Sequence, residues 1–260
     1  MNRQSGEVDY LTHCKDIVSS INVSDLSGRT LGNRIGSGSH STMYELGQIY
    51  IPKAIGLSIG IKVNIEPSND RNANTALRNR FVSELRDVAV MTKRAPSLTP
   101  KFPFFMGLLA TERSGTLLGI LTEDASKGGR YKPRQKHRLN YATQQQLIDG
   151  FKDIGGWDAF AYYYEFAYQA AFSVGGQERI LDLSPSALQD DKPKGGEDYR
   201  AEYGVMRRQV ERSIGTLLIK INDKSDLAQS LGALRQQHNH MQQSSTNKPA
   251  AHVNSEQSAG

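Results

Sequence analysis

The stretch Arg29–Gly47, RTLGNRIGSGSHSTMYELG, decides the fold. It places an Ile-Gly-Ser-Gly turn between two segments typical of strands, which predicts a hairpin with a glycine-rich tip. Gly36 and Gly38 have no Cβ, so the backbone of the tip can approach a ligand closely. Backbone N–H groups in such a tip can bind phosphate. The stretch lacks the Gly-Lys-Ser/Thr ending of a P-loop and the helix of a dinucleotide-binding turn, so an ordinary hairpin turn is the alternative.

Composition bounds the class of protein. The chain has 260 residues, 37% of them hydrophobic, which is enough for one large domain or two small lobes. No apolar run approaches the length that spans a bilayer, and the first ten residues are not typical of a secretory signal peptide. The single cysteine, Cys14, excludes an internal disulfide and fits a reducing compartment. A formal net charge of +5 favours an anionic ligand or partner without choosing among nucleotide, nucleic acid and acidic protein.

Hydrophobic periodicity predicts a sheet followed by helices. Residues 29–65 are expected to form three strands, the last of which, LSIGIKVNI, alternates apolar with small or polar positions. Residues 75–93 have helical spacing, and two further strands follow in PFFMGLLATE and GTLLGILTE. Later helices are expected after a capping box at Thr143, over Trp157–Ser173, and over Ala201–Asn222.

Lys62 and Glu84 form the first candidate site. Lys62 interrupts an otherwise apolar strand, and Glu84 is near the centre of the following helix. A lysine in an apolar strand is costly to bury unless it is paired, so we expect Glu84 to pair with it. This pair would hold Lys62 against the α- and β-phosphates of a nucleotide under the glycine-rich tip. An unrelated five-stranded sheet with one helix is the alternative interpretation.

The order of these segments resembles the amino-terminal lobe of the protein-kinase fold. IGSGSHSTMY resembles the glycine-rich loop, IGIKV the lysine strand, RFVSELRDVAVM the glutamate helix, and ILTEDASKGG the strand that leads into the hinge. The third glycine of the loop is missing, with His40 or Ser41 in that region. The resemblance covers residues 29–128. It implies an α+β, two-lobed protein-kinase-like fold with a five-stranded antiparallel amino-terminal lobe and a reduced helical second lobe.

Composition, periodicity and the resemblance together divide the chain into five expected segments. They are an N-terminal extension (1–28), the kinase-like amino-terminal lobe (29–126), a basic linker (127–141), the reduced helical lobe (142–235) and a disordered tail (236–260). The tail is expected to be disordered because it shows no apolar period.

The resemblance also implies ATP and Mg²⁺ as cofactors. The residues expected to bind ATP are Ile35, Gly36, Ser37, Gly38, Ser39, Lys62 and Glu123. With Lys62 and Glu84, Asp182 completes the expected catalytic set, because Asp182-Leu183-Ser184-Pro185 resembles the loop whose aspartate serves the substrate hydroxyl. Asp198 is the nearest counterpart of the metal-binding aspartate, with Asp190 and Asp191 as rival ligands. Two residues depart from the family pattern: Ile180 replaces the usual His or Arg, and Ala187 replaces the metal-binding Asn.

Three functions therefore remain open. The first is ATP-dependent phosphoryl transfer to a protein hydroxyl, with Ser/Thr favoured. The second is a catalytically inactive pseudokinase that binds a protein partner. The third is a basic binding protein with no nucleotide role, in which Lys127–Arg138 contacts nucleic acid or another anionic surface. No membrane partner is expected. The expected location is the cytoplasm, with delivery into a host cell as an effector as the alternative.

Overall fold

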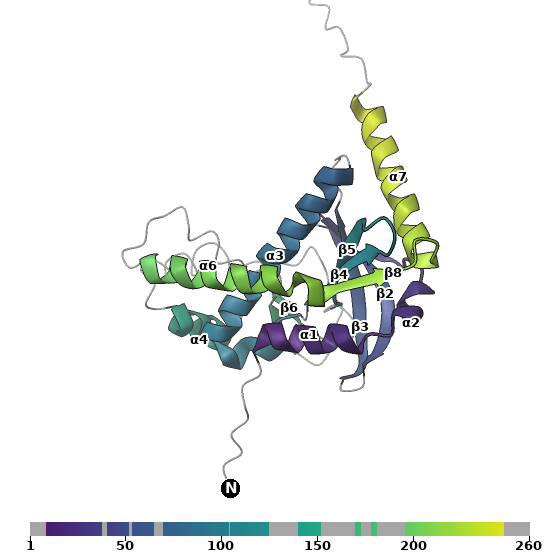
Figure 1. The fold of residues 1–260 in the computed structure, drawn as a ribbon. Coiled ribbons are helices and arrows are strands. Elements are labelled where there is room, and N and C mark those ends of the chain that lie inside the picture. Colours follow the sequence, from purple (N-terminus) through teal and green to yellow (C-terminus); the bar gives the residue numbers. More distant parts are fainter. Residues whose placement is uncertain are drawn as a thin grey trace, which may run out of the picture.

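A six-stranded mixed sheet with helices on both faces forms the centre of the protein (Figure 1). The structure, a computed structural model, describes residues 9–37, 41–51, 54–64, 70–103, 105–124, 140–151, 170–172, 178–180 and 196–246. The strands of the sheet are β1 (Arg34–Ser37), β2 (Ser41–Ile51), β3 (Ala54–Asn64), β4 (Phe105–Thr111), β5 (Leu117–Glu123) and β8 (Leu218–Ile221). A separate hairpin consists of β6 (Ala170–Phe172) and β7 (Glu178–Ile180). The helices are α1 (Tyr10–Ser20), α2 (Val23–Ser27), α3 (Asp70–Arg94), α4 (Tyr141–Phe151), α6 (Gly196–Ser213) and α7 (Asp226–Thr246), with 3-10 turns η1 (Pro96–Lys101) and η4 (Ile214–Leu217).

The sheet has the strand order β1-β2-β3-β5-β4-β8. The first five strands pair antiparallel, and β8 adds to the edge of β4 in parallel. The expected α+β class is confirmed. The expected five-stranded antiparallel sheet was wrong in count and type, because a sixth strand from the second half of the chain joins it.

The sixth strand also corrects the helix expected over 201–222. Helix α6 ends at Ser213, and after η4 the chain enters β8 with Ile219 and Ile221 buried and Lys220 exposed. This alternation is the period of a strand. Over so short a stretch the same apolar residues also fit helical spacing, so only the pairing with β4 decides between the two.

Two hydrophobic clusters cover the two faces of the sheet. On one face, Ile120 of β5 and Leu108 of β4 pack with α3, and α1 and α6 extend this cluster. On the other face, Ile61 of β3 packs with Leu26 of α2 and Leu227 of α7. Because side chains alternate along a strand, residues next to Ile61 point toward α3.

The terminal helices differ from each other in how they pack. Helix α1 buries Tyr10, Leu11 and Cys14 in the first cluster and Ile17 in the second. Helix α7 packs on the sheet through its first turns and then projects away from it (Figure 1). It continues to Thr246, through residues where the sequence shows no apolar period; residues 247–260 lie outside the described ranges.

Two expectations for the middle of the chain also need comment. Most of the helix expected over Trp157–Ser173 lies outside the described residues, but Ala170–Phe172 forms strand β6. At α4 the capping residue is Asn140, whose side chain accepts from the Thr143 backbone N–H at 2.9 Å. Thr143 itself lies inside the first turn of the helix, so the expected capping box was wrong.

Candidate functional site

Lys62 and Glu84 form the ion pair that the sequence predicts. Lys62 Nζ donates to Glu84 Oε2 at 2.7 Å, joining the last residues of β3 to the middle of α3. Arg80, one turn earlier on α3, places its Nε 3.6 Å from the other carboxylate oxygen. The lysine and glutamate side chains are 24% and 22% exposed, so the pair is accessible to a ligand yet partly shielded from water.

The local sequence explains why these two side chains meet. Ile61 and Val63 are buried on the α7 side of the sheet, so Lys62 between them points to the α3 side. On α3, Phe81 and Leu85 are fully buried, which fixes the apolar face of the helix on the sheet. Glu84 borders this face and therefore reaches the sheet at the level of Lys62.

The glycine-rich segment lies in the same cross-strand row as Lys62. Gly36 of β1 pairs with Met43 of β2, Met43 pairs with Lys62 of β3, and Lys62 pairs with Ile120 of β5. Two strand spacings, roughly 10 Å, therefore separate Gly36 from Lys62 along this row. Among the residues that the structure describes, none has an atom within 4 Å of a Cβ added at Gly36, so these residues leave the sheet open at this position.

Apolar side chains lie beside Lys62 on the same strand. A Cβ added at Gly60, two residues before Lys62, would come within 2.5 Å of Met43 Cε and 3.4 Å of Ile35 Cδ1. Ile35 and Met43 therefore lie close against the backbone of Gly60. The α3 side of β3 thus places apolar groups next to a lysine ammonium, which suits a ligand with an apolar ring and an anionic tail.

Glu123, which is expected to bind ATP, has a structural partner for its side chain. It lies at the end of β5, is buried, and forms an ion pair with Arg179 of β7. Arg179 also donates to the Pro100 carbonyl, and burial lowers the pKa of its guanidinium. The Glu123 carboxylate therefore connects the sheet to the β6–β7 hairpin, and any contact with a base at this position would come from its backbone.

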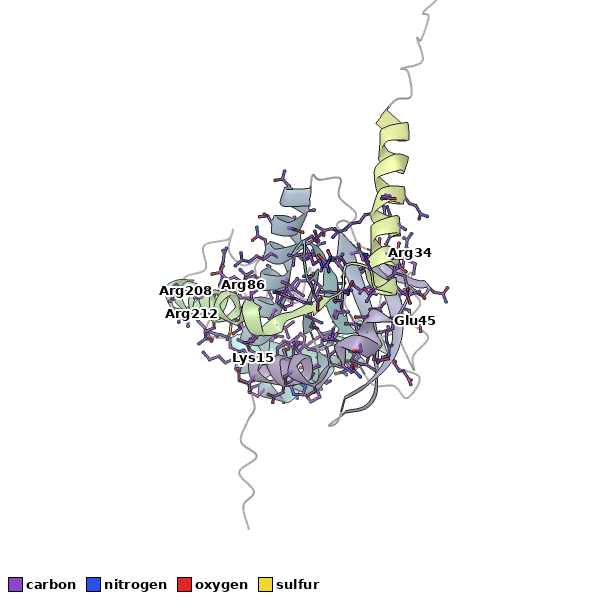
Figure 2. The ribbon with its side chains drawn as sticks, turned by 45° about the vertical axis from the view of Figure 1, so that its right-hand side comes forward. Lys15, Arg34, Glu45, Arg86, Arg208 and Arg212 are labelled. Carbon is purple, nitrogen blue, oxygen red and sulfur yellow. The ribbon has the colours of Figure 1, made fainter. Side chains whose placement is uncertain are left out.

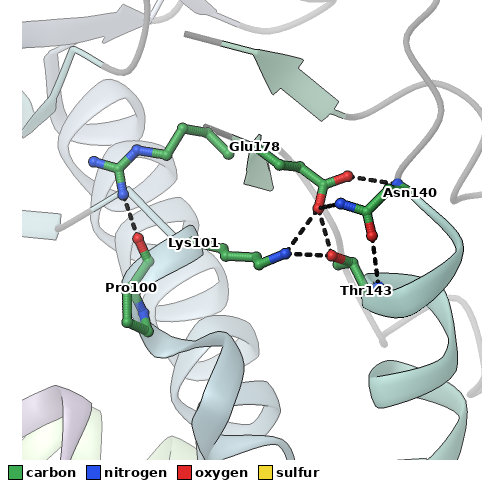
Figure 3. A network of polar contacts seen from close by, with 6 residues as sticks. Pro100, Lys101, Asn140, Thr143 and Glu178 are labelled. Carbon is green, nitrogen blue, oxygen red and sulfur yellow. Dashed lines mark hydrogen bonds and ion pairs between the residues drawn. The ribbon is translucent and has the colours of Figure 1, made fainter. Parts of the chain in front are cut away.

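A buried carboxylate on the same hairpin forms a second polar centre (Figure 3). Glu178 accepts from the Asn140 backbone N–H at 2.6 Å, from Asn140 Nδ2 at 2.8 Å and from Lys101 Nζ at 3.0 Å. The Thr143 hydroxyl donates to the same carboxylate. These contacts join β7, η1 and α4. The sequence gives no signal for them, because the partners are 35 to 77 residues from Glu178.

The remaining expected site residues are placed as follows. Ile35, Gly36 and Ser37 belong to β1. Gly38, Ser39, Asp182, Asp190, Asp191 and the basic segment Lys127–Arg138 lie outside the described residues. Asp198 lies in the first turn of α6, and its side chain is likewise outside them. Among the residues that the structure describes, no group of three or more His, Cys, Asp or Glu side chains is arranged to hold a metal ion.

No protein-family model and no curated protein sequence matches this chain. Within the described ranges, no helix has the length and apolar character needed to cross a membrane.

Proposed function

We propose that this chain is an ATP-dependent phosphotransferase of protein-kinase-like type that acts on a protein hydroxyl. The observation that carries the proposal is the Lys62–Glu84 ion pair in one row with Gly36. A second observation supports the proposal. The strands from the segments that resemble a kinase amino-terminal lobe all belong to one sheet, in the order β1-β2-β3-β5-β4, and α3 follows β3 in the chain. Two features are not part of the kinase-like lobe that the sequence predicts: strand β8, which pairs with β4, and helix α6, which packs on α3.

The residues present suit the phosphate part of ATP. A partly exposed ammonium held by a carboxylate offers a fixed positive charge, and the open position at Gly36 lets backbone approach phosphate oxygens. In this proposal Lys62 binds the α- and β-phosphates, Glu84 fixes Lys62, and Ile35 borders the base. Mg²⁺ would neutralise charge on the transferred phosphate, and its ligands are still predictions, with Asp198 the residue named for that role.

The acceptor side of the proposed site depends on Asp182. This residue follows the end of β7 by two positions in the chain, and β7 is tied to β5 through Arg179 and Glu123. In the proposal the Asp182 carboxylate orients the acceptor hydroxyl or takes its proton. Asp182→Asn keeps the shape of the side chain and removes its basicity, so transfer should fall about a hundredfold or more while ATP affinity hardly changes.

The test combines ATP binding and transfer. Saturating ATP with Mg²⁺, at about a hundred times its dissociation constant, should stabilise the protein by about 2.7 kcal/mol in a thermal-shift titration. Radiolabelled ATP should then transfer phosphate to a protein acceptor. Lys62→Met should abolish transfer, whereas Lys220→Met, on an exposed strand position of the same sheet, should leave it unchanged. If ATP does not stabilise the parent protein, the nucleotide role is wrong, and the remaining hypothesis is a basic binding protein with no nucleotide role.

A pseudokinase is the second candidate, and specific observations favour it. Ile180 and Ala187 depart from the catalytic pattern, and Asp198 is part of a helix. A pseudokinase would bind ATP through Lys62 and transfer no phosphate, so it would use the fold to bind a protein partner. The pseudokinase is supported if the parent protein binds ATP but transfers no phosphate, and if Asp182→Asn binds ATP equally and also transfers none.

A further inference from the structure

A buried ionic cluster lies on α3 one turn beyond Glu84. Asp87 and Arg86 are 4% and 7% exposed. Arg86 donates from Nε and Nη2 to Asp87 Oδ1, at 3.0 and 2.9 Å. The hydroxyl of Tyr203, on α6, donates to the same carboxylate oxygen, and the Arg86 guanidinium lies 3.7 Å from the centre of the Tyr203 ring. Tyr203 therefore makes two contacts in this cluster: its hydroxyl is hydrogen-bonded to Asp87, and its ring is stacked on the guanidinium of Arg86.

A second contact holds the same two helices together. Glu202, next to Tyr203, pairs with Arg94 at 2.7 Å and with Lys93 at 3.1 Å near the end of α3. Figure 2 shows Arg86 beside α6, the helix that carries Arg208 and Arg212. Helix α6 is thus fixed to α3 at two points about two turns apart along α3.

The geometry of α3 links this cluster to the candidate site. Glu84 and Asp87 are three residues apart, so their Cβ atoms are neighbours on one helical turn. A helical turn is rigid, and a rotation of α3 that moves Asp87 away from Tyr203 also moves Glu84 relative to Lys62. The two contacts therefore constrain the same degree of freedom of α3.

The relative strengths of the two contacts indicate which one controls the other. The Lys62–Glu84 pair is about a quarter exposed, and exposed ion pairs contribute little by themselves. Asp87 is nearly fully buried, and a buried carboxylate that loses a hydrogen bond is costly. We infer that Tyr203 is a positioning residue: the buried Phe81 and Leu85 fix which face of α3 meets the sheet, and by holding Asp87 the Tyr203 hydroxyl limits the remaining rotation of α3 and keeps Glu84 on Lys62. The inference deepens the proposed function, on which the role of Lys62 rests, but the coupling itself is measurable without nucleotide.

The first experiment measures how well Lys62 is shielded. The protein is treated with formaldehyde and a borane reductant, and methylation of each lysine is followed by mass spectrometry. Tyr203→Phe removes one hydroxyl and should raise the rate of Lys62 methylation roughly threefold to tenfold, the range expected for loss of one hydrogen bond. Glu84→Gln should raise it at least as much. Lys101 pairs with Glu178 in a separate network and should be methylated at the same rate in all variants. A higher rate at Lys101 would indicate that the whole fold has become less stable.

A double-mutant cycle then tests the route of the effect. If Tyr203 acts through Glu84, the Tyr203→Phe substitution has no further effect on Lys62 methylation when Glu84→Gln is already present. Met206→Leu, a buried and volume-conserving change one turn along α6, serves as the matched control and should leave Lys62 at the parent rate. Asp87→Asn provides a second variant in case Tyr203→Phe does not fold.

The outcomes separate this inference from the proposed function. Unchanged Lys62 methylation in Tyr203→Phe and Asp87→Asn, additive effects in the cycle, or a parallel rise at Lys101 would each overturn the inference. If the parent binds ATP, Tyr203→Phe should weaken its affinity by a similar factor in the parent background and not in Glu84→Gln. If the parent does not bind ATP, the proposed function fails while the methylation result still stands.

Discussion

Gly36 and Lys62 lie in one cross-strand row of the sheet, with Met43 between them. The row places a backbone position with open space around it two strands away from a lysine held by Glu84. Among the described residues nothing packs on Gly36, and Lys62 stands at a strand position flanked by the buried Ile61 and Val63. The combination supports the proposed anionic ligand, which would contact both.

Gly36→Ala tests this relationship directly. A methyl group at this position meets no described residue within 4 Å, and Gly36 is not among the described glycines with positive φ, so the fold should tolerate it within about 0.5 kcal/mol. If phosphate approaches the backbone here, the methyl group should weaken ATP binding by about tenfold, corresponding to one lost hydrogen bond. Isothermal titration of ATP with Mg²⁺ measures the affinity.

Gly215→Ala is the matched control for Gly36→Ala. An added Cβ at Gly215, in η4, also has no atom of the described part of the chain within 4 Å, and Gly215 is far along the chain from the glycine-rich segment. It should change neither stability nor affinity. Equal ATP affinity in the parent and Gly36→Ala would show that phosphate does not contact this part of β1.

Glu178→Gln should destabilise the fold by about 2–4 kcal/mol, because it removes the charge of a buried carboxylate that Lys101, Asn140 and Thr143 all contact. The amide also places a donor among groups that already donate. Urea unfolding followed by circular dichroism measures the change in the free energy of unfolding. Glu211→Gln, which weakens an exposed pair with Arg207, should cost about 0.5 kcal/mol or less. Comparable losses in the two variants would mean that the buried network is not a main support of the β6–β7 hairpin.

The parts of this protein that the sequence predicts are those set by local pattern. The alternation around Lys62 and the helical spacing around Glu84 were sufficient to predict their ion pair. The apolar residues beside Lys62 on β3 and beside Glu84 on α3 must both be buried, and their burial brings the two charged side chains together. Strand β8 was missed because its four residues fit two periods. The Glu178 and Asp87 clusters were missed for a different reason: their partners lie far away in the chain, and a single buried acid has no periodic signature.

The projecting part of α7 should be dispensable, although it is helical. Truncation after Gln236 keeps Leu227 and Leu231, which are fully buried on the sheet, and Arg235, which donates to the Leu117 carbonyl. The melting temperature should then change no more than for a neutral surface substitution. Truncation after Ser225 removes both leucines and should cost about 3–6 kcal/mol, at roughly 1.5–3 kcal/mol for each buried side chain. A large loss on the shorter truncation would mean that residues beyond Gln236 pack on the domain.

Asp223 gives a pH dependence with a definite sign. Its carboxylate accepts from the backbone N–H of Arg113 at 3.0 Å and of Ser114 at 3.4 Å, which ties the β4–β5 turn to the segment between β8 and α7. The hydrogen bond from Arg113, followed by those from Ser114, lowers the pKa of Asp223 below its ordinary value. A lowered carboxyl pKa means that the unfolded state binds the proton more readily, so this contribution to stability is complete above the unfolded pKa, about 3.9, and is lost as the pH falls through the lower folded pKa.

Asp223→Asn should therefore lower the melting temperature at pH 7, and the difference from the parent should shrink as the pH falls from about 4 to 2, where Asp223 in the parent becomes neutral as well. Differential scanning calorimetry of both proteins across this range measures the difference directly. Glu112→Gln, at an exposed carboxylate on the same turn, controls for the general loss of negative charge and should show no such convergence. A difference between parent and Asp223→Asn that is the same at pH 7 and pH 2 would mean that the ionised carboxylate does not stabilise the turn, and that Asp223 acts there only through the shape of its side chain.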